Sequence, residues 1–100
     1  MRKLAPVMTV FVTVELTDHT AAAFRRFETH IERVPDVTAC WALGGGFDYL
    51  MQVMARDIES YQALMDALLD ADVGLARYFT YVVTKSVKAG ALPPLDILGG

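Results

Sequence analysis

The sequence has few of the residues that a covalent, metal-dependent or nucleophilic site requires. Its single cysteine, Cys40, cannot form an internal disulfide, which fits a reducing compartment and a cytoplasmic location. The two histidines, His19 and His30, lie roughly three helical turns apart if one helix holds both, so they cannot share a metal ion. Ser60 and Ser86 are the only serines, and neither follows the strand-turn-helix pattern of a nucleophilic serine. We therefore expect no catalytic residue, no metal site and no cofactor.

Basic charge and long apolar runs are also scarce. Nine Lys and Arg residues stand against twelve Asp and Glu residues, for a formal net charge of −3. The basic residues are scattered without an evident stripe, so we expect no direct nucleic-acid binding by this chain. No apolar run approaches the length that spans a membrane, and no membrane contact is expected. The apolar stretch that follows Arg2 and Lys3 resembles a secretory signal, but Thr9 and Thr13 interrupt it and its period of two favours a strand.

Apolar residues, in contrast, are abundant, at 54% of a chain of 100 residues. Their periodicity predicts one domain, residues 1–100, with a core at about 8–88 and an extended tail at 89–100 laid on a partner. The expected order is β-α-β-β-α-β, a ferredoxin-like α+β fold whose antiparallel sheet carries both helices on one face. Strands are predicted at Met8–Leu16, Val37–Leu43, Phe47–Ala55 and about Arg77–Val87.

The two predicted helices lie between these strands. The first is expected to be capped at Thr17-Asp18 and to end at Pro35-Asp36, and Asp57 is expected to cap the second. The apolar positions of the first are Ala23, Phe24, Phe27, Ile31 and Val34, with Arg25, Arg26, Glu28, Thr29 and Glu32 on its polar face. The expected core stripe of the second is Ile58, Tyr61, Leu64, Met65, Leu68 and Leu69.

Neither face of the predicted sheet is polar enough to meet water. The first strand presents Val10, Val12 and Val14 to one side and Phe11 to the other. With both helices on one side, the second face would remain apolar and exposed in a single copy. We therefore expect an obligate dimer packed sheet to sheet. The second strand is expected to place Val37, Ala39, Trp41 and Leu43 on one face.

Three consecutive glycines join the second and third strands. A hairpin turn needs one or two residues at positive φ, so Gly44-Gly45-Gly46 exposes more backbone than the turn requires. No Gly-Lys-Ser/Thr follows, and the next element is a strand, so neither a phosphate-binding loop nor a dinucleotide fingerprint is present. Asp48 comes two residues after the last glycine, between Phe47 and Tyr49, and its carboxylate suits a ligand ammonium group. The pattern favours a small-ligand loop over a plain hairpin. Two interpretations of Thr80, in the fourth strand, remain open. Either it is simply a residue with high β propensity, or its hydroxyl donates to a ligand carboxylate.

These residues resemble one known family. The segments Val34-Pro35-Asp36-Val37 and Cys40 to Met51, followed by Arg56-Asp57 and Tyr61, resemble the ligand-binding, RAM-type regulatory domain of the Lrp/AsnC transcription regulators. The resemblance extends over about Met8 to Val87. It implies a ferredoxin-like domain that dimerises through its sheets into an α/β barrel-like assembly, and commonly an octamer of four dimers. It also implies an amino-acid effector bound between subunits, with Gly45, Gly46, Phe47, Asp48 and Thr80 as the ligand-binding residues.

The chain departs from the family pattern in three ways. The family often has an acidic residue at the position of Gly46 and Thr or Ser at the position of Tyr78, so the pocket here is expected to be less polar. Members usually carry an N-terminal helix-turn-helix domain, whereas only residues 1–7 precede the first strand here. The resemblance thus implies either a fragment of a longer regulator or a stand-alone sensor module that co-assembles with full-length Lrp/AsnC regulators.

Two other functions remain open from the sequence. Dimeric ferredoxin-like domains also include small cofactor-free monooxygenases and isomerases, and Trp41 and His30 would be the candidate residues of such an enzyme. The third possibility is an assembly module without a ligand.

Overall fold

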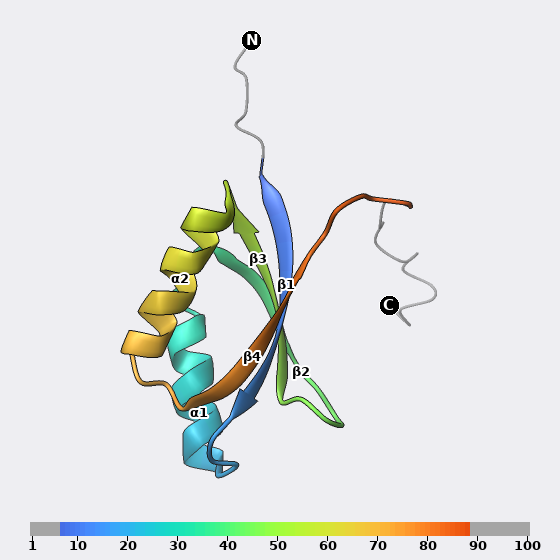
Figure 1. The fold of residues 1–100 in the computed structure, drawn as a ribbon. Coiled ribbons are helices and arrows are strands. Elements are labelled where there is room, and N and C mark those ends of the chain that lie inside the picture. Colours follow the sequence, from blue (N-terminus) through green and yellow to red (C-terminus); the bar gives the residue numbers. More distant parts are fainter. Residues whose placement is uncertain (1–6, 89–100) are drawn as a thin grey trace, which may run out of the picture.

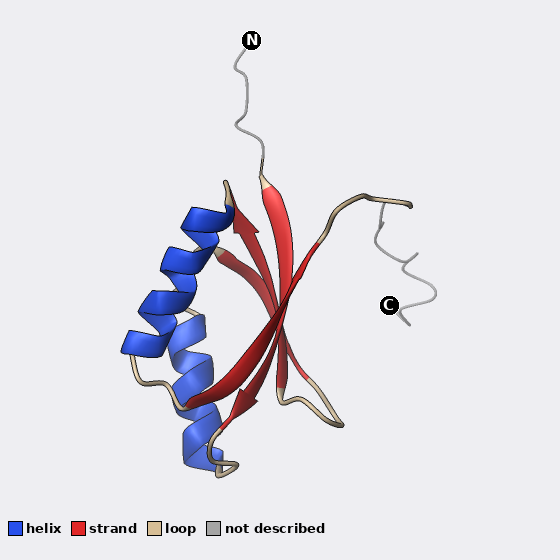
Figure 2. Cartoon of the chain, viewed as in Figure 1, coloured by secondary structure: helices blue, strands red, loops and turns tan. Residues whose placement is uncertain are grey.

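The computed structural model describes residues 7–88, and within them the predicted order of elements is confirmed. The four strands form one antiparallel sheet in the order β2-β3-β1-β4. Both helices cover one face of the sheet, and the opposite face carries no helix (Figure 1; Figure 2). The fold is therefore ferredoxin-like, and the tail predicted at 89–100 lies outside the described residues. The elements are β1 (Met8–Leu16), α1 (Ala21–Ile31), β2 (Val37–Ala42), β3 (Tyr49–Ala55), α2 (Ile58–Asp70) and β4 (Leu75–Val82).

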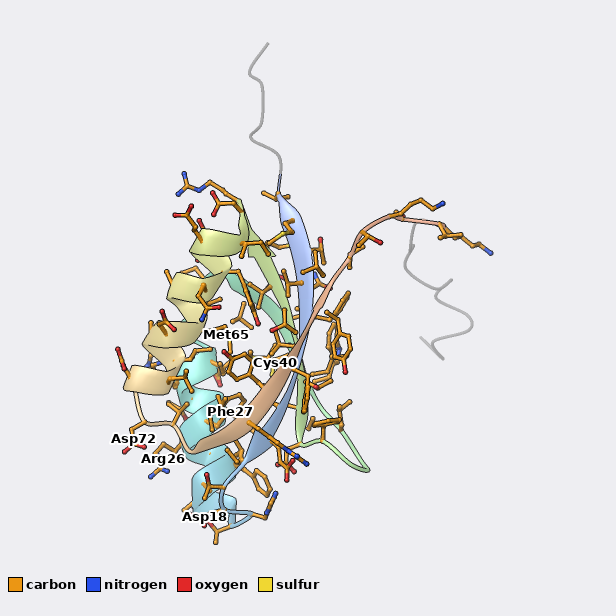
Figure 3. The ribbon with its side chains drawn as sticks, viewed as in Figure 1. Asp18, Arg26, Phe27, Cys40, Met65 and Asp72 are labelled. Carbon is orange, nitrogen blue, oxygen red and sulfur yellow. The ribbon has the colours of Figure 1, made fainter. Side chains whose placement is uncertain are left out.

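The core lies between the helices and the sheet. Strand β1 occupies a central position, and its alternate residues Val10, Val12 and Val14 are fully buried against the helices. Phe27 of α1 and Met65 of α2 point into the same layer (Figure 3). Antiparallel pairing carries the alternation across the sheet, because residues directly opposite one another share a face. The remaining members of this core cluster are Leu16, Ile31, Tyr49, Met51, Val53, Ala55, Tyr61, Leu68 and Val73.

The first helix begins later than its predicted cap. The Thr20 hydroxyl accepts a hydrogen bond from the Ala23 backbone N–H at 3.1 Å, so Thr20 is the N-cap. The predicted cap at Thr17-Asp18 is therefore wrong, since α1 begins at Ala21; the Thr17 N–H donates to the Gly74 carbonyl, which ties residue 17 to the residue before β4. In α2 the predicted cap is confirmed: the Asp57 carboxylate accepts from the Ser60 N–H at 2.8 Å, and this hydrogen bond lowers the pKa of Asp57.

The core stripe of α2 is shorter than predicted. Tyr61, Met65 and Leu68 are buried and Leu64 is half-buried, whereas Ile58 and Leu69 are exposed. Ile58 and Leu69 lie in the first and last turns of the helix, where fewer neighbouring elements are available to cover a side chain.

Two strand predictions need correction. Strand β4 ends at Val82 instead of Val87 because the last register pair with β1 is Val10 with Val82, close to the beginning of β1. In β2 the register with β3 shifts between Val37 and Ala39. Val37 consequently pairs with the buried Val53 on the helix side, while Trp41 pairs with Leu50 on the helix-free side. Val37 and Trp41 were expected on the same face of the sheet, and they lie on opposite faces.

Within residues 7–88, neither helix has the length and apolarity needed to cross a membrane.

Candidate functional site

The glycine loop connects β2 to β3 with an exposed backbone. Only Gly45 has a positive φ, 127°, so a single residue satisfies the turn and the other two glycines exceed its need. A Cβ added at Gly44, Gly45 or Gly46 would meet no atom within 4 Å. The loop is therefore open to contact from outside the chain, which agrees with the ligand-loop interpretation.

The Asp48 carboxylate lies at the base of this loop. Its Oδ2 atom accepts a hydrogen bond from the Leu16 N–H at 2.8 Å and lies 3.0 Å from the His19 Nε2 atom. The Asp48 backbone adds two bonds, from its N–H to the Val14 carbonyl and from the Leu43 N–H to its own carbonyl. Both side-chain contacts use Oδ2, so within the described residues Oδ1 has no partner and can accept from a ligand.

Phe47 folds from the loop onto the helix-free face of the sheet. Its ring packs edge-on against Phe79 of β4, with 5.7 Å between centroids. The Arg77 guanidinium lies 5.9 Å from the Phe79 ring centre, and its Nε atom donates to Glu15 at 2.6 Å. A row of aromatic and charged groups thus continues from the loop across this face. Sequence reasoning missed Arg77 and Glu15, although their spacing of two from Phe79 and Thr13 places them on the same face of their strands.

Thr80 lies on the opposite side of the sheet. It pairs with the buried Val12, and its hydroxyl forms a hydrogen bond of 2.5 Å with the Tyr61 hydroxyl of α2. Its side chain is therefore on the helix side, whereas the Phe47 ring is on the helix-free side. One copy of the chain brings Gly45, Gly46, Phe47 and Asp48 together and does not bring Thr80 to them.

A second group of polar side chains lines a small cavity between α1 and the edge strand β2. The cavity has a volume of about 250 Å³. The Tyr49 hydroxyl donates a hydrogen bond to the Glu28 carboxylate, and burial together with this bond raises the pKa of Tyr49. Burial, with a smaller contribution from Glu28, raises the pKa of the Cys40 thiol to about 11. This cavity was not predicted, because the helical pattern puts Glu28 and Glu32 on the polar face of the first helix. The lining residues are Glu28, Ile31, Glu32, Cys40, Ala42 and Tyr49.

The candidate residues of an enzyme are not brought together. Trp41 is exposed on the helix-free face, and His30 lies on α1, which covers the other face. His19 precedes α1 instead of belonging to it and contacts Asp48. Among the described residues, no three His, Cys, Asp or Glu side chains are placed to hold a metal ion.

Comparison with known proteins adds independent information. A family model described as the Lrp/AsnC ligand binding domain matches residues 9–93. The transcriptional regulatory protein DoeX of Halomonas elongata is 52% identical over 79 residues, which are 79% of this chain and 50% of DoeX. The chain therefore spans about half the length of this relative.

Solved structures agree with this match. An AsnC family transcriptional regulator from Agrobacterium tumefaciens superposes with a TM-score of 0.82 at 24% identity, covering 94% of this chain and 61% of that one. A transcriptional regulator from Neisseria meningitidis, solved as its complex with L-Met, gives a TM-score of 0.79 at 25% identity, covering 91% and 58%. The family model covers most of the chain, and the identity to DoeX agrees with it. The chain therefore belongs to the Lrp/AsnC family, as a copy of its ligand-binding domain.

Proposed function

We propose that this domain binds a small amino-acid effector at a subunit interface and thereby regulates transcription as part of, or together with, an Lrp/AsnC regulator. The observation that carries the proposal is the glycine loop with its open backbone, followed two residues later by Asp48, whose Oδ1 atom has no hydrogen-bond partner among residues 7–88. Backbone N–H groups can hold the ligand carboxylate, and the Asp48 carboxylate can hold its ammonium group. The neighbour from Neisseria meningitidis, solved with L-Met, supports an amino acid as the ligand class.

The placement of Thr80 supports binding at an interface. The Phe47 ring and the Thr80 side chain lie on opposite faces of the same sheet, so they cannot both contact one small molecule within a single copy. If all five predicted residues contact the ligand, one subunit contributes Gly45, Gly46, Phe47 and Asp48 and another contributes Thr80. Ligand binding would then stabilise the assembled state over the separated one.

The helix-free face supports assembly into dimers. Trp41, Phe79 and Tyr81 are 47%, 44% and 55% exposed on this face, beside the half-buried Phe11 and Leu50. Covering an exposed apolar surface of this kind with a partner stabilises the complex by about 25 cal/mol of free energy for each Å² that is buried. We infer a sheet-to-sheet dimer with a barrel-like arrangement, octamers of four such dimers, and co-assembly with full-length regulators in the cytoplasm.

A thermal-shift screen over the common amino acids tests the effector. At least one amino acid should raise the melting temperature, because a ligand that binds only the folded state stabilises it. Asp48→Asn should weaken this response while keeping an oxygen that accepts from the Leu16 N–H. Gln62→Ala, an exposed change on α2, is the matched control and should respond as the wild type does.

The two alternative functions, an assembly module and a cofactor-free enzyme, predict different experimental results. A dimer that responds to no amino acid would favour an assembly module without a ligand. Turnover of a small aromatic or quinol substrate by the pure protein would favour a cofactor-free enzyme and contradict the proposal.

A further inference from the structure

The helical layer contains a second hollow, remote from the helix-free face. It has a volume of about 510 Å³ and lies between α1 and the connection from α2 to β4. Arg26 and Asp72, which line it, lie close together where this connection passes α1 (Figure 3). A hollow of this size is within the range of small-molecule sites. Its lining residues are Arg25, Arg26, Thr29, His30, Arg33, Ala71, Asp72 and Val73.

The charge of this hollow is opposite to that of the chain. Arg25, Arg26 and Arg33 line it, with Asp72 as the one carboxylate that residues 7–88 contribute to the lining, whereas the whole chain has a net charge of −3. None of the three arginines takes part in an ion pair among residues 7–88. Arg25 and Arg26 lie on α1 and Arg33 lies just after its end, so the fold gathers these three basic residues around the hollow without a continuous stripe along the helix.

The opposite wall of the hollow has a defined shape. Asp72 and Gly74 both have positive φ, 55° and 85°, so the connection turns sharply towards β4. The Gly74 carbonyl accepts from the Thr17 N–H, which fixes the connection to the end of β1. A Cβ at Gly74 would lie 3.4 Å from the Arg26 Nη2 atom, so the guanidinium rests against this backbone. The Arg26 guanidinium thus lies beside the connection, while the residue remains exposed at the hollow.

We propose that this hollow binds a small anion that carries more than one phosphate group. Arginine is the side chain best suited to phosphate, because its planar fork donates two parallel hydrogen bonds. The three arginines keep the lining positively charged even with Asp72 present, and their guanidinium groups together with the Thr29 hydroxyl can donate to the oxygens of a diphosphate group. The α-ammonium and α-carboxylate groups of an amino acid cancel in charge at neutral pH, so an effector with an uncharged side chain at the glycine loop would not need this cluster. The domain would then bind two different ligands at two separate sites, an amino acid at the glycine loop and a diphosphate at the hollow.

Calorimetric titration of the whole chain with inorganic pyrophosphate, at constant ionic strength, tests this site. Saturable binding should weaken about tenfold in Arg26→Gln and again in Arg33→Gln, the usual effect of losing one charged hydrogen bond. Arg56→Gln is the matched control: this arginine is exposed just before α2 and does not line the hollow, so its loss should leave the affinity unchanged. Circular dichroism should show the same folded spectrum for all three variants.

Two further ligands define the chemical class. A nucleoside diphosphate should bind at least as well as pyrophosphate and lose affinity in the same two variants. Citrate, a polyanion without phosphate, should bind at least about tenfold more weakly, because its planar carboxylates do not reproduce the tetrahedral oxygen geometry of a diphosphate. The absence of saturable pyrophosphate binding, equal weakening by Arg56→Gln, or citrate binding as tight as pyrophosphate would each overturn the proposal.

Discussion

Asp48 has a structural role in addition to the ligand role proposed for it. Its Oδ2 atom satisfies the Leu16 N–H at the end of β1, so truncation leaves a partly buried donor without a partner. We predict that Asp48→Ala lowers the free energy of unfolding by about 1–3 kcal/mol, the usual cost of such a donor. Urea denaturation of the two proteins measures the difference.

Two variants separate the roles of this residue. Asp48→Asn keeps an acceptor for Leu16 and should recover most of the stability, while losing the charge that a ligand ammonium would need. His19→Ala should change stability little, because His19 is exposed in its contact with Asp48. An Asp48→Ala protein as stable as the wild type would show that the Leu16 contact has no energetic weight.

Cys40 should be an unreactive thiol. Its pKa is raised from 9.0 to about 11, so at pH 8 the fraction of reactive thiolate is about a hundredfold smaller than in the unfolded chain. We predict that iodoacetamide labels Cys40 about a hundredfold more slowly in the native protein than in urea, as followed by mass spectrometry. Glu28→Gln should raise the native rate, because the Glu28 carboxylate disfavours the thiolate. Equal rates in the native and unfolded protein would contradict the placement of Cys40 beside α1.

At the scale of elements, the first helix depends on a cap that the pattern of residues did not locate. The Thr20 hydroxyl accepts from the Ala23 N–H, so Thr20→Ala should lower the free energy of unfolding by about 1 kcal/mol. Thr17→Ala is the matched control, since the structure uses the backbone of Thr17 and shows no hydrogen bond from its side chain within residues 7–88. Chemical denaturation followed by circular dichroism measures both. A larger loss of stability in Thr17→Ala than in Thr20→Ala would contradict Thr20 as the cap and support the cap predicted at Thr17-Asp18.

Element boundaries show where sequence patterns reach their limit. The alternation of Met8 to Leu16 predicted β1 over its full length, because a strand buried on one face must alternate. The end of β4 was not predictable in this way, since apolar and β-branched residues continue beyond Val82 and only the length of β1 limits the pairing. The register shift in β2 likewise depends on β3, and it moves Val37 to the other face.

At the scale of the whole molecule, the helix-free face should control the assembly. We predict that Phe79→Lys or Trp41→Lys reduces the mass in solution from that of a dimer or larger species to that of one chain, because a buried lysine would lack a partner. Light scattering at micromolar concentration measures this. Ile58→Lys is the matched control: Ile58 is also exposed and apolar but lies on α2, so its substitution should leave the mass unchanged. A monomeric wild-type protein would contradict the inferred dimer.

By itself, the sequence determined the order of elements, the two-layer fold and the open glycine loop, because periodicity and turn residues encode local geometry directly. Only the tertiary structure showed that Thr80 and Phe47 lie on opposite faces, that Asp48 is bound to Leu16, and that three arginines on and just after α1 line a hollow beside the turn before β4. These relations join residues far apart in the chain. They depend on which strand pairs with which and on where each helix lies across the sheet, and no local pattern of residues records that information.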